Sequence, residues 1–263
     1  MKGGVLMYSV TQRISKVKQP RGGYINPKRL EVIEQPALGE LAEAENIHTS
    51  LVGLAVDYLT RLENGAAVKE AFKISGSGAV ELSRVDDNAI GLCAGLMDQV
   101  KSGLSDETIT AACKLSGFDC CFRAGLAVYR PVENINPDAD TISNIRLMVN
   151  RSLAFIEAYG PVTMDGFTFP GGYTEMVSAG DGDFLTKDTL WDFKVSVKPP
   201  TNKNTLQLLM YWRMGLHSIH DEFNTIEYLG FFNPRLNTVY RIAVADIDEA
   251  TITEVERDVI CYE

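Results

Sequence analysis

The fold of this chain is decided by Gly180-Asp-Gly-Asp-Phe-Leu-Thr-Lys-Asp-Thr-Leu-Trp-Asp-Phe-Lys194. From Trp191 to Lys198 apolar and polar residues alternate, which predicts a strand with one face on a core, because neighbouring side chains of a strand point to opposite faces. Thr186–Thr189 has the length and composition of a tight hairpin turn. A turn centred between residues 187 and 188 pairs Phe184 with Trp191. The stretch therefore predicts a β-hairpin of fixed register.

The same register places two carboxylates opposite each other. Asp183 faces Asp192, and Lys194 shares the face of Asp192 on the polar side of the strand, off the apolar core. Directly opposed side chains lie about 4.5–5.5 Å apart at Cβ, and like charges in this arrangement are destabilising. A bound cation would remove the repulsion, and Mg²⁺ is commonly held by one or two carboxylates together with water and phosphate oxygens. We therefore expect a divalent metal at this hairpin.

Three ordered elements carry a resemblance to a known family. They are Gly180–Asp183, then Asp192–Lys194, then a predicted helix with Gln207-Leu-Leu-Met-Tyr211. This set resembles the RecB-like branch of the PD-(D/E)XK nucleases. The resemblance implies that Asp183 and Asp192 ligate Mg²⁺ or Mn²⁺ and that Lys194 positions or activates the attacking water. It also implies that Gln207 and Tyr211 steady the DNA strand.

A third metal-binding carboxylate is not fixed by the sequence. In RecB-like nucleases an upstream helix often reads Gly-x-x-Val/Ile-His, with the histidine as a further ligand. This chain has Gly53-Leu-Ala-Val-Asp57, so Asp57 stands at the histidine position. An aspartate is a good ligand for a hard ion, but helical spacing places Asp57 away from the apolar stripe of its helix. Glu157 and Glu175 are the alternative candidates.

Composition limits the class of protein. The 263 residues are 45% hydrophobic and 23% charged, which are values of a globular chain. No apolar run is long enough to span a membrane, and residues 1–7 lack the apolar length of a signal peptide. The five cysteines show no C-x-x-C spacing, which suits reduced core thiols and argues against the iron–sulfur cluster of some RecB-like nucleases. We therefore expect a cytoplasmic protein without membrane contact.

The charge is distributed unevenly. The net charge is −10, yet residues 1–30 contain seven basic residues and no acidic one. Such a segment could lie along phosphates, or it could be a solvated arm or a subunit-docking segment, so a homo-oligomer or a repair partner protein is a further expectation. Residues 31–46 are rich in acid and predicted to be loop-like. We expect an N-terminal arm over 1–46, basic and then acidic.

The rest of the chain predicts an α/β fold. Helices are expected at about 47–62, 66–73, 87–102, 105–116, 138–159 and 203–219. Strands are expected from about 162 to 197, and again at 225–233 and 238–245. Together these elements predict a central mixed β-sheet with flanking helices, in the manner of a restriction-endonuclease-like core, with a large helical N-terminal portion. The expected nuclease domain spans 47–263 and carries a helical insertion at about 64–137.

The function expected from these residues is metal-dependent hydrolysis of DNA phosphodiester bonds by an exonuclease or a DNA end-processing enzyme. Asp183, Asp192 and Lys194 are the expected catalytic residues. The rival interpretation is a catalytically inactive protein that keeps the nuclease fold and binds nucleic acid or a partner protein. The intact set of three residues favours the enzyme, whereas the acidic composition and the undecided third carboxylate favour the binding module.

Overall fold

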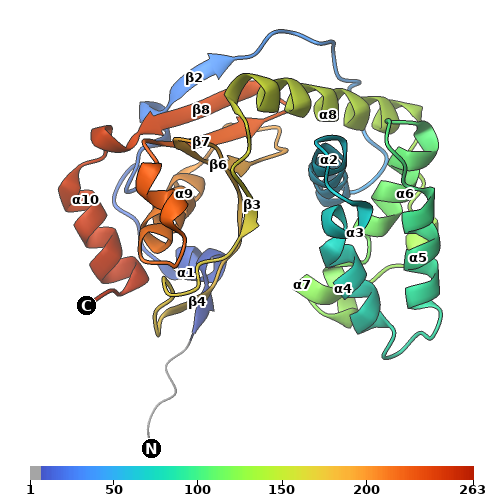
Figure 1. Ribbon diagram of the computed structural model, residues 1–263, viewed down its shortest axis with the longest axis horizontal. Coiled ribbons are helices and arrows are strands. Elements are labelled where there is room, and N and C mark those ends of the chain that lie inside the picture. The colour runs from blue at the N-terminus through green and yellow to red at the C-terminus, as the bar shows by residue number, and fades with distance from the viewer. Residues whose placement is uncertain (1–6) are drawn as a thin grey trace, which may run out of the picture. The chain divides into compact units, whose positions relative to one another are not determined.

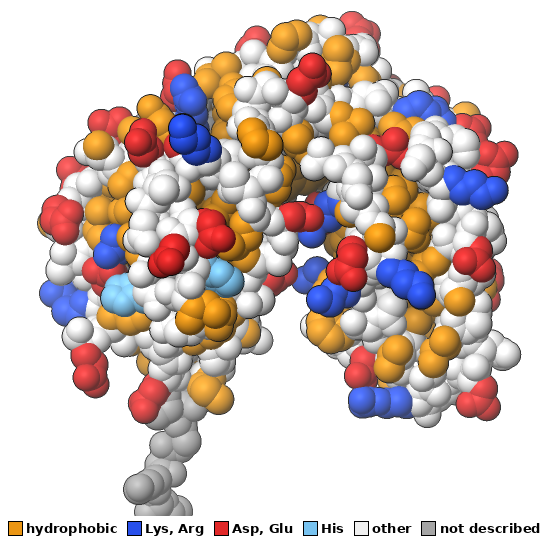
Figure 2. Space-filling view, in the orientation of Figure 1, with side chains coloured by type: hydrophobic (Ala, Val, Ile, Leu, Met, Phe, Trp, Pro, Cys, Tyr) orange, Lys and Arg blue, Asp and Glu red, His pale blue; other side chains and the backbone are white. Residues whose placement is uncertain are grey.

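The structure, a computed structural model, describes residues 7–263 and divides into two compact units (Figure 1). The first unit combines the described part of Met1–Gln35 with Phe155–Glu263, and the second is Pro36–Ala154. These limits differ from the expected boundaries at residue 47 and at about 64–137. On the face shown in Figure 2, charged side chains are scattered among apolar and uncharged ones on both units. None of the described helices has the length and apolarity needed to cross a bilayer.

The first unit is built on a six-stranded mixed sheet. Its strands, in the order β2-β8-β7-β6-β5-β3, are Glu31–Glu34, Thr238–Ala243, Tyr228–Asn233, Thr189–Phe193, Gly182–Leu185 and Met164–Phe167. Neighbouring strands are antiparallel except for β6 and β7, which are parallel. A parallel pair needs a crossover connection, and here it contains helix α9 (Asn202–Leu216). The expected central mixed sheet with flanking helices is confirmed.

Smaller elements complete the first unit. Helix α1 (Val10–Lys16) starts with a capping box between Ser9 and Gln12. The short strands β1 (Tyr8–Ser9) and β4 (Val177–Ala179) pair in parallel. Helix α10 (Glu249–Glu254) continues into the π-helical segment η6 (Val255–Ile260).

The predicted hairpin is present with the predicted register. Phe184 pairs with Trp191 and Leu185 with Leu190 across β5 and β6, and the Thr186 N–H donates to Thr189 O at 3.0 Å to close the turn. The ring of Trp191 lies against Gly230 on β7, where a Cβ would come within 2.4 Å of the indole. Strand β6 ends at Phe193, earlier than predicted, and Val197 is 68% exposed. The alternation after Phe193 therefore does not mark a strand face.

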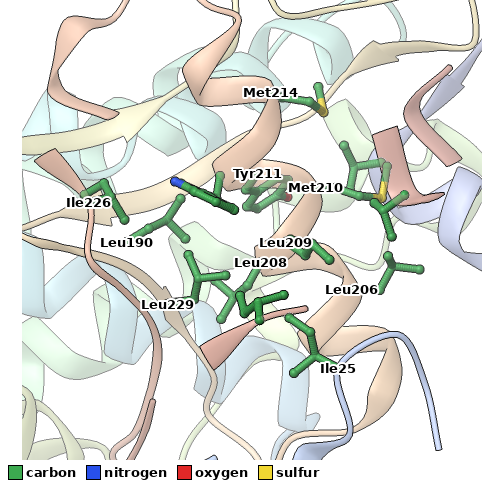
Figure 3. Packing of buried hydrophobic residues seen from close by; sticks show 14 of the residues in the cluster. Ile25, Leu190, Leu206, Leu208, Leu209, Met210, Tyr211, Met214, Ile226 and Leu229 are labelled. Atoms are coloured by element: carbon green, nitrogen blue, oxygen red, sulfur yellow. The ribbon is translucent and has the colours of Figure 1, made fainter. Parts of the chain in front are cut away.

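Apolar residues cover both faces of the sheet, in alternation along the strands β5 to β8. Trp191 lies in one cluster with Phe155 and Phe232, and the last residues of helix α8 (Ala139–Tyr159) cover that face. Leu190 and Leu229 belong to the cluster on the other face, where α9 packs. Figure 3 shows this second cluster, with Leu206, Leu208, Leu209, Met210, Tyr211 and Met214 of α9 among its members.

Residues between Val10 and Leu30 contribute to this core, which corrects two expectations. Val10, Ile14, Ile25 and Leu30 are buried in the cluster under α9, so the described part of the basic segment is not a solvated arm. The predicted loop at 31–46 begins with an edge strand, β2, which pairs with β8. The charged residues in β2 mask its strand character, because an edge strand tolerates charge on both sides.

The second unit is helical. Its helices are α2 (Thr49–Glu63), α3 (Val68–Ala71), α4 (Lys73–Leu82), α5 (Ala89–Gln99), α6 (Asp106–Ser116), α7 (Asp119–Arg123) and most of α8. Helix α4 was not predicted, because the glycines at 76 and 78 conceal its periodicity. Gly78 lets the backbone of Phe118 approach so closely that a Cβ would come within 2.0 Å of its carbonyl oxygen. The glycine thus serves helix packing rather than a turn.

Candidate functional site

The hairpin and the segment after it bring Asp183, Asp192 and Lys194 together. Asp192 lies near the end of β6, and Lys194 follows the strand directly. The Lys194 ammonium is 3.0 Å from Oδ1 and 2.9 Å from Oδ2 of Asp192. Asp183 lies one residue beyond the printed ladder pair of Phe184 with Trp191, and its Oδ2 accepts a 2.6 Å hydrogen bond from the Phe193 N–H. The structure therefore places all three residues at one end of the hairpin.

Asp192 is buried, which corrects the expectation that its side chain points away from the core. Its exposed fraction is 3%, because α9 covers this face of the sheet. Burial raises the pKa of Asp192 to about 6; the Lys194 ammonium opposes this rise, while the nearby Asp183 carboxylate adds to it. Desolvation and a second carboxylate therefore raise the proton affinity of Asp192 in spite of the Lys194 ammonium.

The Lys194 ammonium is attracted to more than one carboxylate. Burial alone would lower its pKa, but attraction to Asp192, Asp183 and Asp181 outweighs burial, so the pKa of Lys194 is raised. Asp181 was not among the predicted site residues. Its position in Gly180-Asp-Gly-Asp183 could have marked it, since residues 181 and 183 share a face if the strand continues. The lysine is thus a protonated group facing several carboxylates.

Gln207 and Tyr211 lie on α9 and contact each other. Gln207 Nε2 donates a 2.8 Å hydrogen bond to the Tyr211 hydroxyl. Tyr211 is buried, and its ring centroid is 5.1 Å from that of Phe169, in the cluster of Figure 3. Burial raises the pKa of Tyr211, and the Asp192 charge adds to that rise. Tyr211 therefore belongs to the wall behind the site, and only the half-buried Gln207 has surface to offer a ligand.

The candidates for a third carboxylate lie on elements other than the hairpin. Asp57 lies on α2 in the second unit, where it accepts a 3.1 Å hydrogen bond from Arg61. Glu157 is exposed near the end of α8, the helix that covers the opposite face of the sheet from Asp192. Glu175 is exposed before β4. Within residues 7–263, no group of three or more His, Cys, Asp or Glu side chains is arranged to hold a metal ion.

A divalent ion can nevertheless be tested against the two hairpin carboxylates. Asp192 Oδ2 is buried without a hydrogen bond of good geometry among the described residues, although Lys194 Nζ lies near it. Such an oxygen has a lone pair available for coordination. Asp183 Oδ2 accepts the hydrogen bond from the Phe193 N–H, and the Asp183 carboxylate lies near enough to Asp192 to raise its pKa. Two carboxylates fit a Mg²⁺ ion that completes its shell with water and substrate oxygens. Lys194 would have to move aside from Asp192.

Asn233 is a further residue that sequence reasoning missed. It is buried at the end of β7, where its Nδ2 donates a 2.7 Å hydrogen bond to Ser196 O and its Oδ1 accepts a 3.0 Å bond from the Arg235 N–H. It therefore anchors the segment that follows Lys194. Ligands of open α/β sheets gather at the carboxyl ends of parallel strands, so a polar residue ending the strand beside β6 could have been noticed.

A scan against protein-family models, a search of curated proteins and a search of solved structures each gave no match.

Proposed function

We propose that this protein is a metal-dependent nuclease that hydrolyses phosphodiester bonds in DNA, as an exonuclease or in the processing of DNA ends. The observation that carries the proposal is the buried Asp192 carboxylate, which has one oxygen without a hydrogen bond, pairs with Lys194 and lies near the Asp183 carboxylate. A restriction-endonuclease-like core of the RecB-like branch is part of the proposal. It is supported by the mixed sheet with its α9 crossover.

The proposed chemistry assigns a role to each residue. Asp183 and Asp192 would hold Mg²⁺ or Mn²⁺, which when bound polarises the phosphate and lowers the pKa of coordinated water. Lys194, kept protonated by its acidic neighbours, would donate hydrogen bonds to the attacking water or to a phosphate oxygen and stabilise negative charge there. Asp181 would help to hold the ammonium group when Asp192 turns to the metal. Gln207 would contact the substrate strand from α9.

A second candidate function has its own support. The Asp192–Lys194 ion pair is complete without any ligand, and Tyr211 is buried. A nuclease-like fold that binds nucleic acid or a partner protein without cleaving it is consistent with these observations. Cleavage of DNA that requires a metal ion would identify the nuclease, whereas binding without cleavage would identify the binding protein.

The test is digestion of end-labelled linear, circular and single-stranded DNA with Mg²⁺ or Mn²⁺. Asp192→Asn and Lys194→Ala should each lower the cleavage rate by about 100- to 1,000-fold, the scale for loss of a charge-stabilising group. The matched controls Asp188→Asn and Lys187→Ala change exposed residues at the turn of the same hairpin and should cut at the wild-type rate. Circular dichroism should show all four variants folded. Unchanged cleavage by Asp192→Asn and Lys194→Ala would exclude this site.

A cytoplasmic location belongs to the same proposal. All five cysteines are free, and burial raises the pKa of the Cys93 thiol to about 11 and of the Cys113 thiol to about 12. Unreactive core thiols are usual in a reducing compartment.

A further inference from the structure

Two acid-free segments that are far apart in the sequence meet in the first unit. Residues 7–30 contain six basic side chains and residues 193–220 contain four, and neither segment has an aspartate or glutamate. The Thr205 hydroxyl donates a 2.7 Å hydrogen bond to Ile25 O, and a Cβ on Gly23 would come within 2.5 Å of that of Asn202. Arg29, Lys194 and Arg213 form ion pairs with Asp248, Asp192 and Glu256 of other segments, so the remaining basic residues carry the positive charge of this region.

A pocket of about 620 Å³ opens where the two segments meet, and we name it the proline pocket. Its wall includes Pro27, Lys28, Val32, Pro199, Pro200 and Tyr240. The volume is within the range of small-molecule sites, about 300–1,000 Å³. Val32 is 59% exposed, an unusual exposure for a valine in a strand. Lys28, Lys198 and Lys203 are exposed, and no described carboxylate forms an ion pair with them.

The proline pocket lies on the same face of the sheet as Asp192. Asp192 on β6 pairs with Phe231 on β7, and Phe231 pairs with Tyr240 on β8. Tyr240 in turn pairs with Val32 on β2. Paired residues present their side chains to the same face. Neighbouring strands are about 4.8 Å apart, so Tyr240 lies about 10 Å along this row from Asp192. The segment from Lys194 to Asn202 also connects the candidate site with the pocket wall.

We propose that the proline pocket receives a base of a single DNA strand whose phosphates lie along Lys28, Lys198 and Lys203 toward Asp192. The proposal deepens the proposed function, because it assigns the substrate strand a path beside the candidate site. Strand-binding proteins without sequence preference combine a positive track for the backbone with apolar or aromatic surfaces for the bases. The prolines and Tyr240 supply the apolar wall, and the lysines supply the track.

The test is fluorescence anisotropy of a labelled 12-nucleotide oligo(dT) with the full chain in EDTA, so that binding is read without cleavage. Lys28→Ala/Lys198→Ala should weaken binding about tenfold and reduce the slope of log affinity against log salt by about 1.4, since each lost phosphate contact removes about 0.7 for a single strand. The control Lys69→Ala/Lys187→Ala removes the same charge from exposed sites elsewhere and should leave the slope unchanged.

A second pair of variants tests the pocket itself. Val32→Glu places a carboxylate at its wall and should weaken oligo(dT) binding at least about fivefold, because the added charge opposes the phosphates. The control Val80→Glu changes a valine that is 56% exposed on α4 and should bind as the wild type. Circular dichroism confirms that each variant is folded.

The outcomes separate this proposal from the nuclease proposal. Any one of three results would overturn the strand path even if DNA is cleaved. They are a wild-type salt slope in Lys28→Ala/Lys198→Ala, a wild-type affinity in Val32→Glu, and no binding of oligo(dT) by the wild type. Binding that depends on Lys28, Lys198 and Val32 in a protein that cuts no DNA would keep the path and reject the nuclease. Competition by an uncharged proline-rich peptide, with no salt dependence, would identify the pocket as a peptide site instead.

Discussion

Asp192 in the first unit and Asp119 in the second are both buried aspartates, with exposed fractions of 3% and 2%. Burial raises the pKa of each. Their hydrogen bonds differ. Asp119 accepts from the Tyr58 hydroxyl on Oδ2 and from the Ser75 hydroxyl at 2.7 Å on Oδ1, with Arg123 3.7 Å away. Among residues 7–263, the donor to Asp192 is the Lys194 ammonium on Oδ1; Oδ2 makes no hydrogen bond of good geometry although Lys194 Nζ is 2.9 Å away, and a second carboxylate lies nearby.

The difference shows that a buried acid with a raised pKa does not by itself mark a functional site. Asp119 connects α2, α4 and α7 through its two hydroxyl donors, and its environment uses both oxygens. A structural network explains it fully. At Asp192 the ion pair with Lys194 leaves Oδ2 without a hydrogen bond of good geometry, and Asp183 adds a like charge that the fold alone does not require. Unused lone pairs, rather than proton affinity, distinguish the two aspartates.

The largest expected effect is on stability. Asp119→Ala leaves the buried hydroxyls of Tyr58 and Ser75 without an acceptor, which should cost the second unit about 2–4 kcal/mol. Asp192→Ala should cost about 1 kcal/mol or less, because Lys194 is one-third exposed and keeps Asp183 and Asp181 as neighbours.

Urea unfolding measures both changes in the free energy of unfolding. Trp191 and Trp212 are the only tryptophans and both lie in the first unit, so their fluorescence reports that unit, while far-ultraviolet circular dichroism reports the helices of both. Equal losses of unfolding free energy in Asp119→Ala and Asp192→Ala would contradict the proposed difference between the two aspartates.

The next effect is stabilisation by metal. Millimolar Mg²⁺ or Mn²⁺ should raise the melting temperature of the first unit, since a ligand at 100 times its Kd adds about 2.7 kcal/mol to the folded state. Asp183→Asn and Asp192→Asn should abolish the rise, and Asp119→Asn should keep it. Differential scanning fluorimetry of intrinsic tryptophan emission measures this. Testing Asp57→Asn, Glu157→Gln and Glu175→Gln in parallel identifies a third ligand. A rise that survives in Asp183→Asn and Asp192→Asn contradicts the metal site.

The smallest effect is a pH dependence that belongs to Asp119. Its folded-state pKa is raised, mainly by burial and despite hydrogen bonds from Tyr58 and Ser75, so the folded protein holds this proton more tightly than the unfolded chain does. Stability from this group is therefore present at low pH and is lost as pH rises from the unfolded pKa through the raised folded pKa. Circular dichroism melts of wild type and Asp119→Asn between pH 4 and 7 should differ by a slope of this sign. Parallel profiles would show that Asp119 does not titrate in this window.

Local pattern was sufficient to predict the hairpin register, the helix that corresponds to α9, and the strands β7 and β8. Each depends on residues close in sequence, such as Phe184 with Trp191. The burial of Asp192 could not be predicted, because it depends on how α9 packs over the sheet. Strand β2 was missed because its partner β8 lies about two hundred residues away, beyond the reach of any local signal.

The pairing of β2 with β8 has a consequence for synthesis. Glu34 leaves the ribosome roughly 200 residues before its partner Thr238, a delay of about 10–40 s at 5–20 residues per second. The helical unit, continuous from Pro36 to Ala154, can complete its fold during that delay. The nascent protein must keep β2 unpaired until β8 has been synthesised, so the row from Asp192 to Val32 cannot form before that point.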